Sequence, residues 1–197
     1  MTGSYVLSFQ VYLALPLHAA DLAPQHQALL IAALFVVSGV VAVAAQLRVT
    51  RWFSSRWGTS RSLVIGMTVV ALSFTPLILL PDTRFGTPAG IAALLLSTAV
   101  LAIGSAAVFP FEMDTVVGLS GGRLVGTHYG FYSTIVGVGI LAGNVATGAL
   151  MQAANQHSLG VLVWTALTGI GLLCTAALHT LARNGHLREA HLATANP

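Results

Sequence analysis

Long apolar stretches separated by short polar segments dominate the pattern along the 197-residue chain. A membrane-spanning α-helix needs about 20 apolar residues to cross a hydrocarbon core of about 30 Å. No stretch alternates every second residue, so the pattern favours helices over strands. We therefore expect an all-α polytopic domain at 1–182, followed by a polar cytoplasmic tail at 183–197. Six stretches have the required length and predict the spans 3–20, 28–47, 62–81, 89–111, 127–150 and 160–182.

Composition supports a lipid environment for most of the chain. Only 7% of the residues are charged, 56% are apolar, and the mean hydropathy is +0.85. A soluble domain of this size needs more charge to keep its surface hydrated. The formal net charge of +3 is small and scattered, which argues against a nucleic-acid partner. The single cysteine, Cys174, excludes an internal disulfide and a multi-cysteine metal site.

Arginine placement predicts the orientation of the spans. Cytoplasmic loops carry an excess of Lys and Arg, so the dense cluster between spans two and three indicates a cytoplasmic turn. This places both termini in the cytoplasm and the chain in the cytoplasmic membrane. The same cluster has two interpretations, an anchor at the lipid headgroups or a latch that pairs with acids and helix ends during a conformational change. Its members are Arg48, Arg51, Arg56 and Arg61.

The two halves of the chain share a weak pattern. Val6-Leu7 precedes Pro16 at the same offsets at which Val100-Leu101 precedes Pro110. These spans would cross in opposite directions, as a three-plus-three inverted repeat requires. Chance similarity between two helices rich in Val, Leu and Ala is the alternative.

Span five is rich in glycine, which permits close approach of helix backbones in a membrane. It predicts either tight static packing or a helix that slides during a transport cycle. The packing candidates are Gly137, Gly139, Gly143 and Gly148. A buried amide inside a span must find a partner or line a wet cavity. We therefore expect Gln10, Tyr132 and Asn144 to line a substrate cavity.

Two acids, Glu112 and Asp114, follow Pro110 at the predicted cytoplasmic end of span four. Carboxylates at or within a membrane are candidates for carrying protons. The alternative is simple pairing with Arg123 or with the arginines of 48–61. The seven histidines do not cluster in a metal-binding spacing. We expect no metal and no cofactor.

Several segments together resemble the C-terminal half of a major facilitator superfamily transporter of the drug/proton-antiporter type. Those segments are 8–17, 46–66, 110–130 and 137–148. The resemblance implies alternating-access transport or efflux of a small molecule, often coupled to protons, by two six-helix halves. A second six-helix half is therefore an expected partner, besides lipid and substrate. The chain departs from the family pattern where an acid would fall near Ser54 or Ser55, and where Asn144 replaces a proline.

Two other classes remain as alternatives. One is a channel-like or structural membrane subunit, although no charged ring or filter motif supports a pore. The other is an intramembrane protease using Ser120 and His179, which needs the two side chains to meet inside the membrane. We expect no enzymatic activity.

Overall fold

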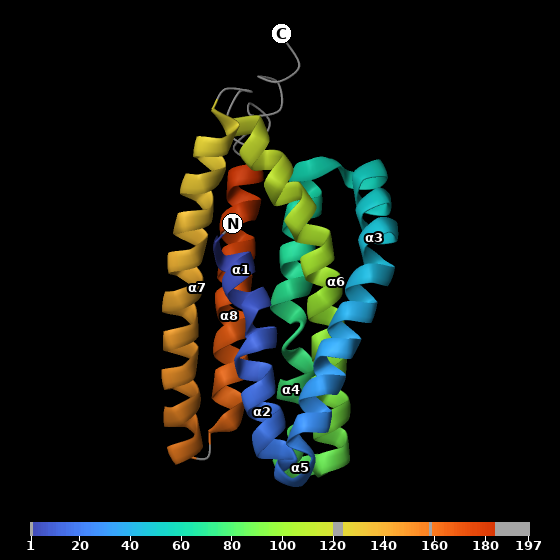
Figure 1. The fold of residues 1–197 in the computed structure, drawn as a ribbon, viewed down its shortest axis with the longest axis vertical. Coiled ribbons are helices and arrows are strands. Elements are labelled where there is room, and N and C mark those ends of the chain that lie inside the picture. The colour runs from blue at the N-terminus through green and yellow to red at the C-terminus, as the bar shows by residue number, and fades with distance from the viewer. Residues whose placement is uncertain (1, 120–123, 158, 184–197) are drawn as a thin grey trace.

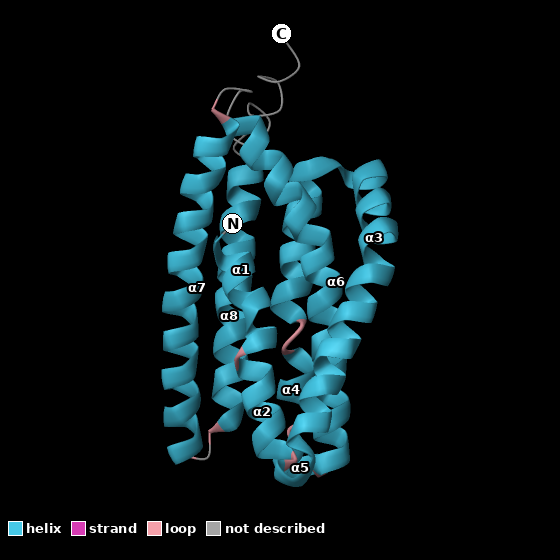
Figure 2. Cartoon of the chain, in the orientation of Figure 1, coloured by secondary structure: helices cyan, strands magenta, loops and turns pink. Residues whose placement is uncertain are grey.

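A computed structural model describes residues 2–119, 124–157 and 159–183 of the chain. Helices make up nearly all of this part, and it contains no strand (Figure 2). The long helices lie roughly side by side as a bundle (Figure 1). The elements are α1 (Thr2–Ser8), η1 (Phe9–Tyr12), α2 (Ala14–Leu22), η2 (Pro24–His26), α3 (Gln27–Leu72), α4 (Thr75–Leu79), α5 (Asp82–Phe85), α6 (Thr87–Leu119), α7 (Val125–Gln156) and α8 (Gly160–Arg183).

Five segments of the described residues are long and apolar enough to cross a membrane. They are Pro24–Gln46, Arg61–Phe85, Thr87–Gly118, Val125–Gln156 and Gly160–Arg183. The first predicted span is helical too, but it consists of the three short pieces α1, η1 and α2. An all-α membrane protein therefore agrees with the prediction, and the sixth crossing remains a prediction.

Pro16 accounts for the break in the N-terminal segment. A proline has no N–H to donate four residues back, and its ring clashes with that carbonyl, which here belongs to Tyr12. The preceding turn tightens into the 3-10 helix η1, in which Leu13 N donates to Gln10 O at 3.3 Å. Regular helix resumes when Leu17 N donates to Leu13 O at 3.0 Å. The continuous helix expected over 3–20 is thus divided near its middle.

Pro76 divides the predicted span 62–81 for the same reason. It cannot donate to the carbonyl of Leu72, and α3 ends at that residue. The Thr75 hydroxyl takes over this carbonyl at 2.6 Å, while the Ser73 hydroxyl donates to Val70 O at 2.7 Å. Side-chain donors of this kind let a helix break inside a membrane without leaving backbone groups unsatisfied.

The arginine-rich segment 48–61 differs from the expected loop, because its backbone is helical within the 46-residue α3. In Figure 1 the ribbon of α3 turns over in this segment. We call residues 27–46, before the turn, the first arm of α3 and residues 61–72, after it, the second arm. The turn lies at the same end of the bundle as the C-terminal end of α6 and the start of α7. Of the predicted tail at 183–197, Arg183 ends α8, and residues 184–197 lie outside the described residues.

The core lies around α6 and the second arm of α3. Over half of the membrane-length window of α6 is buried (56%), whereas the first arm of α3 (11%) and α7 (17%) lie at the periphery. Close backbone approach makes this core possible: a Cβ on Gly104 would lie 2.8 Å from Val70 N, and one on Gly66 would lie 2.7 Å from Val108 Cγ2. The two peripheral helices leave many apolar side chains exposed, including Val43 and Leu141.

Candidate functional site

Glu112 is the centre of a polar cluster in which α1, α6 and α7 meet. Sequence analysis places it at a span end, but α6 continues past Pro110 to Leu119, so this carboxylate sits inside a helix and is fully buried. Ser4 Oγ on α1 donates to Glu112 Oε1 at 2.5 Å. Tyr132 OH on α7 donates to Glu112 Oε2 at 3.2 Å. One carboxylate thus bridges two other helices through hydroxyl groups.

Small hydroxyls and aromatic rings continue this cluster along the contact between α1 and α6. The Tyr5 ring stacks on Phe109 with centroids 4.6 Å apart and meets Tyr132 edge-on at 6.3 Å. One turn further along α1, the Ser8 and Ser105 hydroxyls share a hydrogen bond of 2.8 Å. Sequence analysis missed these residues. A usable signal was the pair Ser4 and Ser8, hydroxyls four residues apart on one helix face.

The two predicted cavity amides lie together across the α1–α7 contact. Gln10 is fully buried in η1, and its Nε2 donates to Val6 O at 2.8 Å and to Asn144 Oδ1 at 3.3 Å. These acceptors fix the orientation of the Gln10 amide. Its Oε1 is consequently buried without a hydrogen-bond partner among the described residues. An unsatisfied buried acceptor costs about 1–3 kcal/mol.

The four packing candidates of α7 fall into two pairs. A Cβ on Gly143 would overlap Val6 Cγ1, and a Cβ on Gly139 would overlap Thr2 Cγ2, so both glycines are needed for contact with α1. Gly137 and Gly148 have no atom within 4 Å of such a Cβ among the described residues. The structure therefore does not place these two against a neighbouring helix.

The remaining predicted residues lie away from this cluster. Asp114 is exposed, so the two acids of α6 occupy different environments. The hydrogen-bond partners of Glu112 in the described part of the chain are hydroxyls rather than arginines. Three of the four turn arginines, Arg48, Arg56 and Arg61, are exposed. Arg123 and the side chain of Arg51 lie outside the description.

The rival interpretation as an intramembrane protease depends on Ser120 and His179. Ser120 falls outside the described residues, and His179 is exposed on α8. The described residues also contain no group of three His, Cys, Asp or Glu side chains that could hold a metal ion.

A groove of about 220 Å³ opens beside η1, between α1, the first arm of α3, and α6. Its wall is apolar and aromatic with three serine hydroxyls, and it contains no charged residue. The Tyr12 ring lies against Phe9 and Phe35, with centroid distances of 5.5 and 5.8 Å. This wall suits an uncharged or weakly polar surface of a small molecule. The lining residues are Ser8, Phe9, Val11, Tyr12, Ser38, Ala42, Leu101, Ala102, Ser105 and Phe109.

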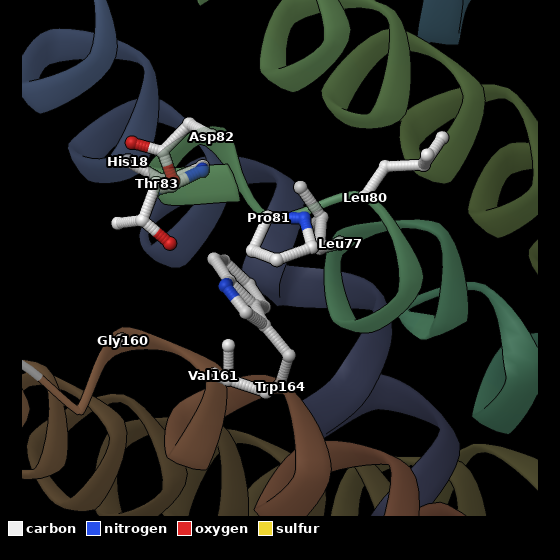
Figure 3. Close-up of a pocket in the computed structure, with 9 residues that line it drawn as sticks. All are labelled: His18, Leu77, Leu80, Pro81, Asp82, Thr83, Gly160, Val161 and Trp164. Carbon is white, nitrogen blue, oxygen red and sulfur yellow. The ribbon is translucent and has the colours of Figure 1, made fainter. Parts of the chain in front are cut away.

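A smaller cavity of about 70 Å³ lies at the end of the bundle opposite the arginine turn. Figure 3 shows His18 and Asp82 close together above the Trp164 ring. The His18 imidazole meets that indole edge-on at 5.3 Å. This cavity has room for a few water molecules and is remote from Glu112, so we assign the candidate site to the cluster around Glu112 and Gln10.

Comparison with known proteins finds similarity to proteins that are named as transporters. It is 57% identical over 182 residues to uncharacterised MFS-type transporters from two strains of Mycobacterium tuberculosis, which covers 92% of this chain and 43% of theirs. It is 27% identical over 179 residues to the multidrug resistance protein MdtH of Sodalis glossinidius, covering 91% of this chain and 42% of that protein. The chain thus spans less than half the length of these curated relatives. No family model and no solved structure matches it.

Proposed function

We propose that this homologue of MFS-type transporters forms one six-helix half of a secondary transporter, and that the assembled protein moves a small molecule across the cytoplasmic membrane. Homology supports membrane transport in general. The resemblance in sequence order supports a C-terminal half, which requires a first half for a closed substrate path. The exposed apolar faces of α7 and the first arm of α3 are available for lipid or for that partner.

The observation that carries the proposal is the fully buried carboxylate of Glu112 among membrane-length helices. A carboxylate in a bilayer interior is expensive, and it persists where it pairs or takes part in transport. Glu112 is the coupling residue that carries a proton, and the exposed Asp114 is not. Of the two coupling candidates that the sequence analysis named, we thus propose only Glu112.

Substrate contact belongs to the broken segment η1 and the helices next to it. Discontinuous helices in transporters place polar groups at substrate depth, because irregular backbone is tolerated where it lines a cavity. Gln10 and Asn144 supply amide groups there, and Tyr132 links that region to Glu112. The groove beside η1 supplies an aromatic wall.

A reconstitution experiment tests this function. The chain is placed in proteoliposomes, alone or together with the part of the 57% identical mycobacterial relative that has no counterpart here. An imposed pH gradient and the fluorescent aromatic cation ethidium serve as driving force and probe, and the intact relative serves as positive control. We expect gradient-dependent dye accumulation only when both halves are present.

Matched variants separate the outcomes. Glu112→Gln abolishes accumulation in the two-half assembly, whereas Asp114→Asn leaves it close to the unsubstituted level. Dye that merely equilibrates, with no response to the gradient, indicates a channel-like subunit instead. Absence of accumulation in the assembly, while the intact relative accumulates dye, argues against a half-transporter.

A further inference from the structure

Glu112 joins three helices in a way that depends on its charge. Each of its oxygens accepts one hydrogen bond, from Ser4 on α1 and from Tyr132 on α7. An ionised carboxylate only accepts hydrogen bonds, while a protonated one also carries an O–H donor. Hydrogen bonds to the ionised form are also roughly twice as strong as neutral ones. Both hydroxyls therefore favour the ionised carboxylate.

We propose that Ser4 and Tyr132 are positioning residues through which the charge of Glu112 controls how tightly α1 packs against α7 and α8. A proton from water adds to one carboxylate oxygen, and no other covalent bond forms or breaks. That oxygen becomes a donor, so the hydroxyl that donated to it must turn around or withdraw. The longer bond, from Tyr132, is the one expected to open.

The Glu112 bridge acts on a short helix, α1. This helix has only seven residues. Its contact with α7 rests on Thr2 and Val6 against Gly139 and Gly143, where side chains meet bare backbone, and on a side-chain hydrogen bond between Tyr5 and Tyr132. Loss of the Glu112 bridge weakens this contact with α7, while the Tyr5–Phe109 stacking and the hydrogen bonds Ser8–Ser105 and Gln10–Asn144 still hold the segment.

Cys174 on α8 is a built-in reporter of this packing. A Cβ on Gly3 would lie 2.5 Å from Cys174 Sγ, so the start of α1 covers the thiol closely. The chain contains no other cysteine. Any loosening of α1 that follows protonation of Glu112 exposes this thiol to a small reagent.

The effect of Glu112 on the labelling rate must be distinguished from the titration of other groups near the cluster. Tyr5 on α1, Tyr132 on α7 and the amino terminus of the chain interact electrostatically with Glu112, and Tyr129 on α7 acts on Tyr5. Tyrosines ordinarily titrate near pH 10, far above the range tested, but an α-amino group titrates near pH 8. The experiment therefore uses the full chain with an acetylated N-terminus.

The test measures the rate at which N-ethylmaleimide labels Cys174 in lipid nanodiscs. At about pH 7.5 we expect Glu112→Gln to raise the rate several-fold and Tyr132→Phe to raise it by a smaller factor. Asp114→Asn should leave it unchanged, since that side chain lies outside the cluster. Glu112→Asp, which keeps the charge, should stay nearer to the unsubstituted rate than Glu112→Gln does.

A pH series distinguishes a charge effect from simple loss of packing. The ratio of the Glu112→Gln rate to the unsubstituted rate cancels thiol ionisation, and it should fall toward one as the pH is lowered and Glu112 takes up its proton. Hydrogen exchange of residues 2–8 should rise over the same range only when Glu112 is present. Equal rates for Glu112→Gln and the unsubstituted chain, or a ratio that ignores pH, would overturn the proposal.

This inference takes its meaning from the proposed transport function, but the labelling needs neither substrate nor a second half. A pH-dependent ratio without transport would support the role of Glu112 in the packing of α1 and would contradict the proposed transport function. Transport together with a ratio that does not depend on pH would contradict only the role of Glu112 in the packing of α1.

Discussion

Single residues decide where polar chemistry sits in this apolar chain. Glu112 is buried and accepts two hydroxyl donors, while Asp114, two residues along the same helix, is exposed. In a helix, residues two positions apart point to different sides, so these environments follow from the periodicity. The same periodicity puts Gly139 and Gly143 on one face, against α1, and leaves Gly137 on another.

A glycine prediction belongs to this scale. Gly143→Ala should lower the free energy of unfolding by about 1–3 kcal/mol, because the added Cβ overlaps Val6. Gly137→Ala is the matched control; it should be neutral or slightly stabilising, since alanine suits a helix better than glycine. Thermal unfolding in detergent measures both. Equal losses at the two positions would contradict the packing of α1 on α7.

The unpartnered oxygen of Gln10 leads to a second prediction. Gln10→Met removes a buried acceptor that lacks a partner and keeps a similar volume, but it also removes the donor to Val6 O and Asn144 Oδ1. These effects oppose one another, so the loss of stability should stay below about 3 kcal/mol. If Gln10 contacts substrate, the same change should strongly reduce dye accumulation by the two-half assembly. A large loss of stability together with unchanged accumulation would assign Gln10 a purely structural role.

Prolines set the shape of the elements. Pro16 divides the first segment at η1, Pro76 ends α3 at Leu72, and Pro110 lies inside α6 without ending it. Each removes one backbone donor, but the outcomes differ because neighbouring groups differ. The Thr75 hydroxyl donates to the Leu72 carbonyl that Pro76 leaves without a backbone donor. Before Pro16 the backbone instead tightens into the 3-10 helix η1, in which Gln10 hydrogen-bonds to Asn144.

Replacement of Pro16 tests the role of this break. Pro16→Ala restores a backbone donor, and a straighter helix should be more stable by an amount up to about 3 kcal/mol. Transport should fall, because a continuous helix moves Gln10 out of register with Asn144. Pro88→Ala is the control, as Pro88 lies in the first turn of α6, where its missing donor is unused. Unchanged transport in Pro16→Ala would show that transport does not require the helix break at η1.

At the scale of the whole molecule, a buried pair of helices is flanked by exposed ones. The second arm of α3 and α6 form the interior, and α7 and the first arm of α3 present apolar surface outward. In water such surface would favour aggregation, but in a membrane it meets lipid or another helix bundle. The arginine turn, the C-terminal end of α6 and the start of α7 lie at one end of the bundle.

Orientation gives a prediction at this scale. In a Cys174→Ala background, a cysteine replacing Thr83 should react with a membrane-impermeant reagent added to intact cells. A cysteine replacing Arg56 should react only after permeabilisation, because arginine-rich turns stay in the cytoplasm. Labelling of the Arg56 position from outside would invert the topology.

The sequence by itself determined the all-α class of fold, since a hydrophobic stretch long enough for a bilayer admits few structures other than a helix. It also identified Gln10, Glu112, Tyr132 and Asn144 as residues of interest, because polar groups in apolar runs are conspicuous. Only the tertiary structure decided which of them meet. The pairing of Glu112 with Ser4 and Tyr132 spans 108 and 20 residues of chain, and contacts between helices far apart in sequence leave no local pattern.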